Sequence, residues 1–229
     1  MNIDEARERR IAWAMLILCP LSMFAMFIYV TLGMAPGLDA GHPMIYLQIT
    51  CILWAVVMTI VPMLRILRYV ALPLWFIAIL YADMYMYVVS LCQGLYMELY
   101  WWANFTHVIS TMVVTAIVLL ALCKASTLCP PHVSFGSKGG IITLMFFLGA
   151  AFGAIWEFSE GMTDLLSGFD YMIYGAIDNI GNLAADIVGV IIMVPIAWFM
   201  LSRYGAAEIA SKFRIGRKNI DVRTPSSDV

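Results

Sequence analysis

The sequence predicts an all-α integral membrane protein with six transmembrane helices and both termini in the cytoplasm. Hydrophobic residues make up 63% of its 229 residues and charged residues 12%, and the mean hydropathy is +0.89. These values are typical of a chain embedded in lipid rather than of a water-soluble domain. A helix crosses a bilayer with about 20 mainly apolar residues, and six segments of the sequence meet that description.

The six segments follow one another through short connections and form one domain over residues 11–201, with no visible internal repeat. They run over Ile11–Leu32, Tyr46–Leu64, Tyr69–Cys92, Phe105–Cys123, Ile141–Thr163 and Ile177–Leu201. The first exceeds the apolar run of about 7–15 residues found in cleaved signal peptides, so we expect it to remain as a membrane helix. Residues 1–10 form a cytoplasmic N-terminus, and residues 202–229 form a polar, basic cytoplasmic tail.

All 13 lysine and arginine residues fall at the predicted inner ends of the helices or beyond them. They are Arg7, Arg9, Arg10, Arg65, Arg68, Lys124, Lys138, Arg203, Lys212, Arg214, Arg217, Lys218 and Arg223. By the positive-inside rule, this asymmetry places both termini in the cytoplasm and predicts the inner (cytoplasmic) membrane as the location. The bilayer is the first expected partner, with the basic tail against anionic headgroups. Nucleic-acid binding is disfavoured, because the net charge is −2 and the basic cluster is small.

Residues 139–202 contain no lysine or arginine but carry six carboxylates in mostly apolar surroundings. These are Glu157, Glu160, Asp164, Asp170, Asp178 and Asp186. Ionisable side chains within a membrane are costly, usually face the protein interior and mark functional sites. Since no basic side chain stands nearby in the sequence, another species must offset their charge.

Helical periodicity places most of these polar side chains on two stripes. The stripe on the fifth segment is spaced i, i+3, i+7 and consists of Glu157, Glu160 and Asp164. The stripe on the sixth is spaced i, i+4, i+8 and consists of Asp178, Asn182 and Asp186. Such spacings share one helix face, and two consecutive antiparallel helices can turn these faces toward each other. Gly149 and Gly153 form a small-xxx-small pair that predicts close helix packing.

Two further polar residues reach the same half of the membrane. His107 stands near the start of the fourth segment and Asp83 near the middle of the third. With a rise of about 1.5 Å per residue, Glu157 lies about 9 Å and Asp186 about 13 Å below the outer edge. We therefore expect a polar shaft that opens outward. Its supporting polar residues are Asp83, Asn182 and Asp164.

Simpler structural roles stay open for several of these residues. Asp164 and Asp170 could be solvated loop acids. Asp178 could cap the sixth helix, and Asn182 could form an ordinary bond to a neighbouring helix. His107 alone would more often be a packed interfacial histidine than a ligand. Three residues resist such explanations, because each lies within a span without a basic partner. They are the catalytic candidates Glu157, Glu160 and Asp186.

Several motifs occur in a recognisable order. They are Arg68 with Leu72-Pro73, His107 at the start of a helix, Trp156-Glu157-Phe158-Ser159-Glu160, and DNIGNLAADIVG over residues 178–189. From roughly Tyr46 to Leu201, this order resembles the uncharacterised YjdF-type family of bacterial inner-membrane proteins. That family is distantly similar to the VanZ-like family linked to teicoplanin resistance. Its pattern has an acid where Asn182 stands and an aromatic residue where Gly161 stands. The resemblance implies the membrane fold and the polar positions, and it inclines function toward cell-envelope chemistry.

Three functions fit these features. The first is a metal-dependent membrane enzyme, in which a divalent cation offsets the acids and activates water against a lipid, lipid-linked or other small-molecule substrate. Its expected metal ligands are His107, Glu157, Glu160, Asp178 and Asp186. The second is a proton- or cation-coupled carrier whose acids share protons. The third is a noncatalytic assembly subunit whose acids pair with basic residues of a partner. Because carriers of this size commonly contain an inverted repeat, its absence slightly favours a binding or catalytic site.

Overall fold

The computed structural model describes residues 3–67, 70–72, 74–128, 136–168, 172, 176–212 and 214–215, and six long helices dominate this part of the chain. They are α1 (Ile3–Thr31), α3 (Met44–Ile66), α4 (Leu74–Gln93), α6 (Trp102–Leu128), α7 (Lys138–Ser167) and α8 (Ala176–Lys212). Each is long and apolar enough to cross a membrane, which confirms the predicted all-α fold. The predictions for Arg68, Pro73, Asp170 and residues 216–229 concern residues outside the described set.

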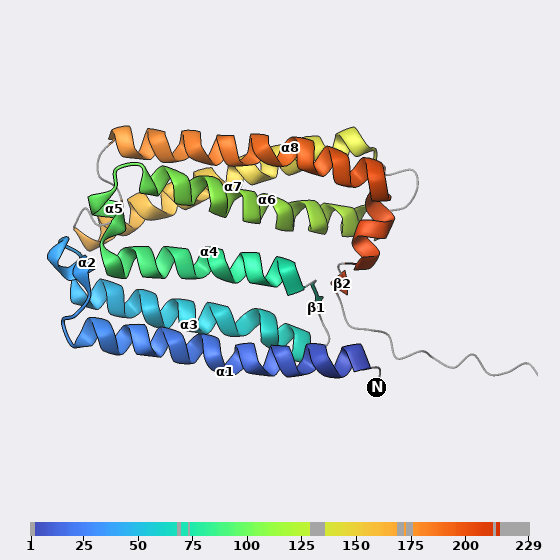
Figure 1. Cartoon of the computed structure of the whole chain (residues 1–229). Helices are drawn as coiled ribbons and strands as arrows, with labels where there is room; N and C mark the ends of the chain where they lie inside the picture. Colours follow the sequence, from blue (N-terminus) through green and yellow to red (C-terminus); the bar gives the residue numbers. More distant parts are fainter. Residues whose placement is uncertain are drawn as a thin grey trace, which may run out of the picture.

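Short elements lie at the two ends of the bundle (Figure 1). α2 (Pro36–Asp39) and α5 (Leu95–Glu98) meet at one end. At the other end, the strands β1 (Val70–Ala71) and β2 (Arg214–Ile215) form an antiparallel pair. The start of α1 and the end of α8 also lie at the strand end (Figure 1). Both ends of the described chain therefore share one side, as an even number of spans requires. The assignment of that side to the cytoplasm stays a prediction.

The long helices form two groups of three (Figure 1). In the first group, α1, α3 and α4 bury a core that includes Met23, Leu47 and Met58. In the second group, α6, α7 and α8 pack more extensively on one another around a core that includes Leu119 and Met145. The main contact between the groups is that of α4 with α6. This division matters for function, because the polar residues gather where the groups meet.

Glycines allow the helices of the second group to approach closely. A Cβ atom on Gly149 would lie 2.5 Å from the hydroxyl oxygen of Thr115, and one on Gly189 would lie 2.7 Å from the carbonyl oxygen of Val108. Gly149 and Gly153 are the small-xxx-small pair, and the contacts of both confirm the predicted close packing. Small residues at such positions let helix backbones come together within a membrane.

Two helices extend further than the sequence predicts. α7 continues past Asp164, which therefore lies in a helix rather than in a loop. α8 continues to Lys212, so residues 202–212 of the expected tail are helical, with an interruption at Gly205 (φ 72°, ψ 160°). The left-handed φ at this glycine redirects the chain at little steric cost. Beyond it Ile209, which is only 2% exposed, packs into the core of the second group.

Candidate functional site

A cavity of about 220 Å³ lies between the two helix groups. The helices α3, α4, α6, α7 and α8 all contribute to its wall. The acidic, imidazole and amide side chains that line it are Asp83, His107, Glu160, Asp178, Asn182 and Asp186. Six of the eight polar residues singled out by the two stripes and the two additional positions thus line a common space, whereas Glu157 and Asp164 are not among its lining residues.

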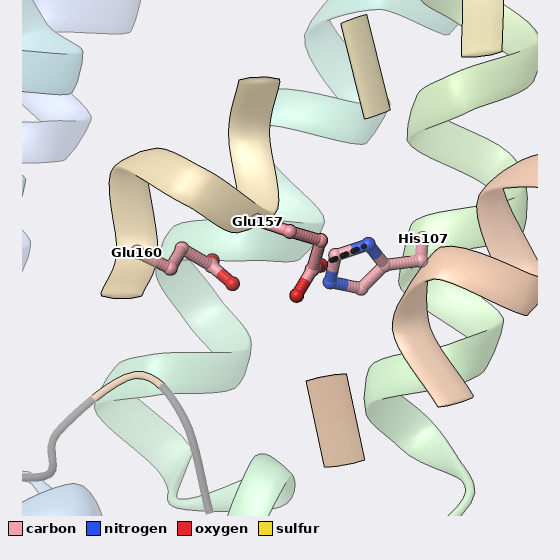
Figure 2. A group of neighbouring side chains, drawn as sticks. All are labelled: His107, Glu157 and Glu160. Atoms are coloured by element: carbon pink, nitrogen blue, oxygen red, sulfur yellow. Dashed lines mark ion pairs between the residues drawn. The ribbon is translucent and has the colours of Figure 1, made fainter. Parts of the chain in front are cut away.

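Three of the predicted metal ligands form a tight group (Figure 2). His107 comes from α6, and Glu157 and Glu160 come from neighbouring turns of α7. Each residue offers one potential ligand atom, and these three atoms all lie within 4.8 Å of one another. Glu157 is 3% exposed and Glu160 is 6% exposed, and the Nδ1 atom of His107 lies 3.4 Å from the Oε1 atom of Glu157. Three residues with ligand atoms this close together could hold a metal ion.

Asp186 of α8 orients the imidazole of His107. Its Oδ1 atom lies 3.2 Å from Nδ1 of His107 and accepts a hydrogen bond of 2.5 Å from the hydroxyl group of Thr111. A neutral imidazole that donates its Nδ1 hydrogen keeps Nε2 as an acceptor. The dashed line in Figure 2 joins the same Nδ1 atom to Glu157, 3.4 Å away. Metal-binding histidines commonly have such a carboxylate on their other nitrogen.

Four buried oxygen atoms near this group have no hydrogen-bond partner within the described part of the chain. They are both carboxylate oxygens of Glu157, Oδ1 of Asn182 and Oδ2 of Asp186. Leaving a buried polar atom unpaired costs about 1–3 kcal/mol, and more if it is charged. Among the described residues that line the cavity there is no lysine or arginine. Nitrogen and carboxylate oxygen donors around an excess of negative charge fit a divalent transition-metal ion.

The remaining predicted residues occupy different places around the group. Asp178 lines the cavity but is not one of the three grouped ligands. Asp83 also lines the cavity and accepts a hydrogen bond of 2.7 Å from Ser110. Asp164 is buried and accepts hydrogen bonds of 3.0 and 3.1 Å from the backbone amide of Met172. The alternative of a solvated loop acid is therefore wrong for Asp164, whose carboxylate binds the backbone amide of Met172.

Two residues that contact Asp186 were not predicted from the sequence. Thr111 stands one turn after His107 and donates to Asp186. Gly153 stands one turn before Glu157 and packs directly against the Asp186 side chain. An i, i+4 spacing to a predicted site residue was the available signal in both cases.

A second feature that the sequence did not reveal is an aromatic wall, which consists of Trp54, Tyr87, Tyr96 and Trp156. All four residues line the cavity. Tyr87 stands at the centre, with ring centroids 5.5 Å from Trp54, 6.2 Å from Tyr96 and 6.1 Å from Trp156. Burial raises the pKa of the Tyr96 hydroxyl above its usual value. The cavity is therefore lined by both acidic groups and aromatic rings.

Comparison with known proteins identifies one family. The model of the family described as "Predicted membrane protein (DUF2238)" matches residues 16–203. The matched region contains every residue of the site and agrees with the predicted resemblance to an uncharacterised membrane protein family. No curated protein and no solved structure matches the chain.

Proposed function

Because this chain belongs to that family of predicted membrane proteins, we propose that it is a metal-dependent membrane enzyme whose divalent cation binds His107, Glu157 and Glu160. One observation supports this proposal above the others. The three side chains form a mostly buried group, and both oxygens of Glu157 lack a hydrogen-bond partner within the described chain. A cation would satisfy these oxygens and offset the charge of the acids.

The positions of the neighbouring residues support a defined ligand set. Asp186 holds the Nδ1 side of His107, so Nε2 is the nitrogen that a cation would meet. Asp186 then acts as a positioning residue and not as a ligand. This assignment narrows the five ligands expected from the sequence to three, and three protein ligands leave coordination positions open, as catalytic metal sites require.

The surroundings suit chemistry on a membrane-derived substrate. The site lies on membrane-spanning helices and faces a cavity with aromatic as well as acidic walls. A bound cation supplies Lewis acidity to a substrate oxygen and to water. We therefore propose hydrolysis or group transfer on a lipid or lipid-linked substrate.

Thermal unfolding of the purified protein tests the metal centre. After treatment with a chelator, the wild type is melted with Mg²⁺, Ca²⁺, Mn²⁺, Co²⁺ and Zn²⁺ in turn. At 100 times its Kd, a cation should stabilise the fold by about 2.7 kcal/mol. Glu160→Gln should lose that gain. Glu98→Gln, which changes an exposed acid on α5, should keep it.

The opposite result would favour a different function. If no cation raises the melting temperature, while acidification stabilises the wild type and Glu160→Gln reproduces that gain, the acids share protons and the metal centre is wrong. The catalytic step needs its own measurement. Membrane vesicles with the wild type should show cation-dependent turnover of a lipid species by mass spectrometry, and vesicles with Glu160→Gln should not.

A proton- or cation-coupled carrier is the second candidate, and one observation favours it. The cavity lies where two helix groups meet, and their main contact is that of α4 with α6. Two such groups could move relative to each other around a central site, as in alternating access. Cation or proton flux into proteoliposomes would support the carrier, and cation-dependent lipid turnover without flux would support the enzyme.

A further inference from the structure

On one side, the cavity is lined by residues of α7 that are also partly exposed. Phe152 and Trp156 both line the cavity, yet 51% of Phe152 and 40% of Trp156 is exposed. α7 packs mainly on α6 and α8 and has few contacts with α3 or α4. The edge-to-face contact between Tyr87 of α4 and Trp156 of α7 bridges this gap. Since these helices are membrane-spanning segments, the exposed side of the gap faces lipid.

The chemistry of the lining indicates which headgroup could enter. Asp83, Asp178 and Asp186 line the cavity together with Glu160, and the described lining residues include no lysine or arginine. An anionic headgroup would therefore be repelled, whereas a cationic one would be attracted.

Two independent observations point to a cation that donates hydrogen bonds. Oδ1 of Asn182 and Oδ2 of Asp186 are buried acceptors without a partner in the described chain. Both residues line the cavity and are 2% exposed. Four aromatic residues line the cavity, and aromatic rings attract an ammonium group by cation–π interaction. A primary ammonium group carries three N–H donors for such acceptors.

We propose that the cavity binds the primary ammonium headgroup of a membrane amphiphile, which enters between α4 and α7. The headgroup lies between the aromatic wall and the acceptors of Asn182 and Asp186, and the alkyl chain leaves past Phe152 and Trp156. The size of the cavity agrees with this assignment. A cavity of about 150 Å³ holds benzene, so about 220 Å³ accommodates a headgroup but not a whole lipid.

This inference rests on the proposed function only for the idea that the bound amphiphile is a substrate. The binding itself can be measured without metal, and neither Asn182 nor Trp156 is one of the three grouped ligands. The two proposals can therefore fail separately.

Binding of radiolabelled dodecylamine to the purified protein in maltoside micelles, with chelator present, tests the proposal. We expect saturable binding that unlabelled dodecylamine displaces best, dodecyltrimethylammonium less well and dodecanol least. Trp156→Leu and Asn182→Leu should each weaken binding about tenfold. Trp13→Leu, which changes a similarly exposed tryptophan on α1, should have no effect. Because this binding is measured in chelator, its loss and the loss of a cation-induced rise in melting temperature are separate results.

Specific results would overturn the proposal. Dodecanol that competes as well as dodecylamine would exclude recognition of the charge. Binding that disappears with chelator and returns with metal would assign the ligand to the metal centre. Unchanged binding in both Trp156→Leu and Asn182→Leu would exclude this pocket. Ethylammonium that displaces the label as effectively as dodecylamine would exclude lateral entry of a lipid and indicate a free amine.

Discussion

The carboxylate of Asp186 fills the space beside Gly153 that any larger residue at that position would need. A Cβ atom on residue 153 would lie 2.5 Å from Oδ2 of Asp186 and 2.8 Å from its Cβ and Cγ atoms. The same carboxylate reaches α6, where it contacts His107 and Thr111. One close approach between α7 and α8 therefore determines both the packing of the helices and the orientation of the histidine.

Substitution of this glycine should disturb the fold and the site together. Gly153→Ala forces the Asp186 side chain away, and overpacking of this kind costs about 1–3 kcal/mol. We expect a lower melting temperature and a smaller cation-induced stabilisation than in the wild type. Gly139→Ala is a matched control on the same helix, because a Cβ atom there meets nothing within 4 Å. Equal melting curves for the two variants would contradict the importance of the Gly153–Asp186 contact.

Asp186→Asn tests whether this residue positions the histidine. The amide keeps the size of the side chain but loses the charge that favours a hydrogen on Nδ1 of His107. Loss of such a partner typically weakens metal binding about 10–100-fold, which cation titrations of the melting temperature would measure. Thr111→Val removes the hydroxyl that bonds Asp186 and should have a smaller effect. Thr127→Val, at an exposed site, is its control. Unchanged cation affinity in Asp186→Asn would show that Asp186 does not position His107 for metal binding.

The spans and the helix faces could be predicted because both depend on local periodicity. Hydropathy located the six spanning helices, and the spacing of Glu157 and Glu160 predicted that they share a face. The helical continuation through Ile209 was not predicted, because it depends on burial against another helix. Composition alone indicated a polar tail there.

Contacts between residues far apart in the sequence could be predicted only in part. The pairing of His107 with Asp186 joins residues 79 positions apart, and depth estimates suggested it without specifying which acid the imidazole contacts. The aromatic wall around Tyr87 was missed, because aromatic residues in a spanning helix contribute to hydropathy whether they face lipid or a cavity. Only the arrangement of α3, α4 and α7 distinguishes these cases.

His42 predicts a pH dependence outside the membrane-spanning segments. This residue is 4% exposed, its Nε2 atom lacks a hydrogen-bond partner in the described chain, and its ring lies 5.9 Å from that of Tyr46. Burial lowers the pKa of His42 below its usual 6.5. As the pH falls below about 6.5, the unfolded chain binds a proton that the folded chain resists. Stability should therefore decrease on acidification, by at most about 1.4 kcal/mol per pH unit from this residue.

The variant His42→Phe isolates this contribution. Thermal melts between pH 7.5 and pH 5 should show a smaller loss of stability on acidification in the variant than in the wild type. The difference between the two proteins is the relevant quantity, because protonation of the site acids changes both curves alike. Parallel curves would show that His42 does not resist protonation in the folded protein.

Glu157→Gln should have effects of opposite sign with and without a cation. In the presence of chelator, the wild type buries a carboxylate whose two oxygens have no hydrogen-bond partner in the described chain. An amide removes the charge, so the variant should be more stable than the wild type by about 1–3 kcal/mol. With a saturating cation the order should reverse, because the variant lacks one charged ligand. Melts of both proteins under both conditions provide the measurement, and Glu98→Gln should match the wild type throughout. A variant that is less stable than the wild type in chelator, or that keeps the full gain from the cation, would show that Glu157 is not the metal ligand that the geometry indicates.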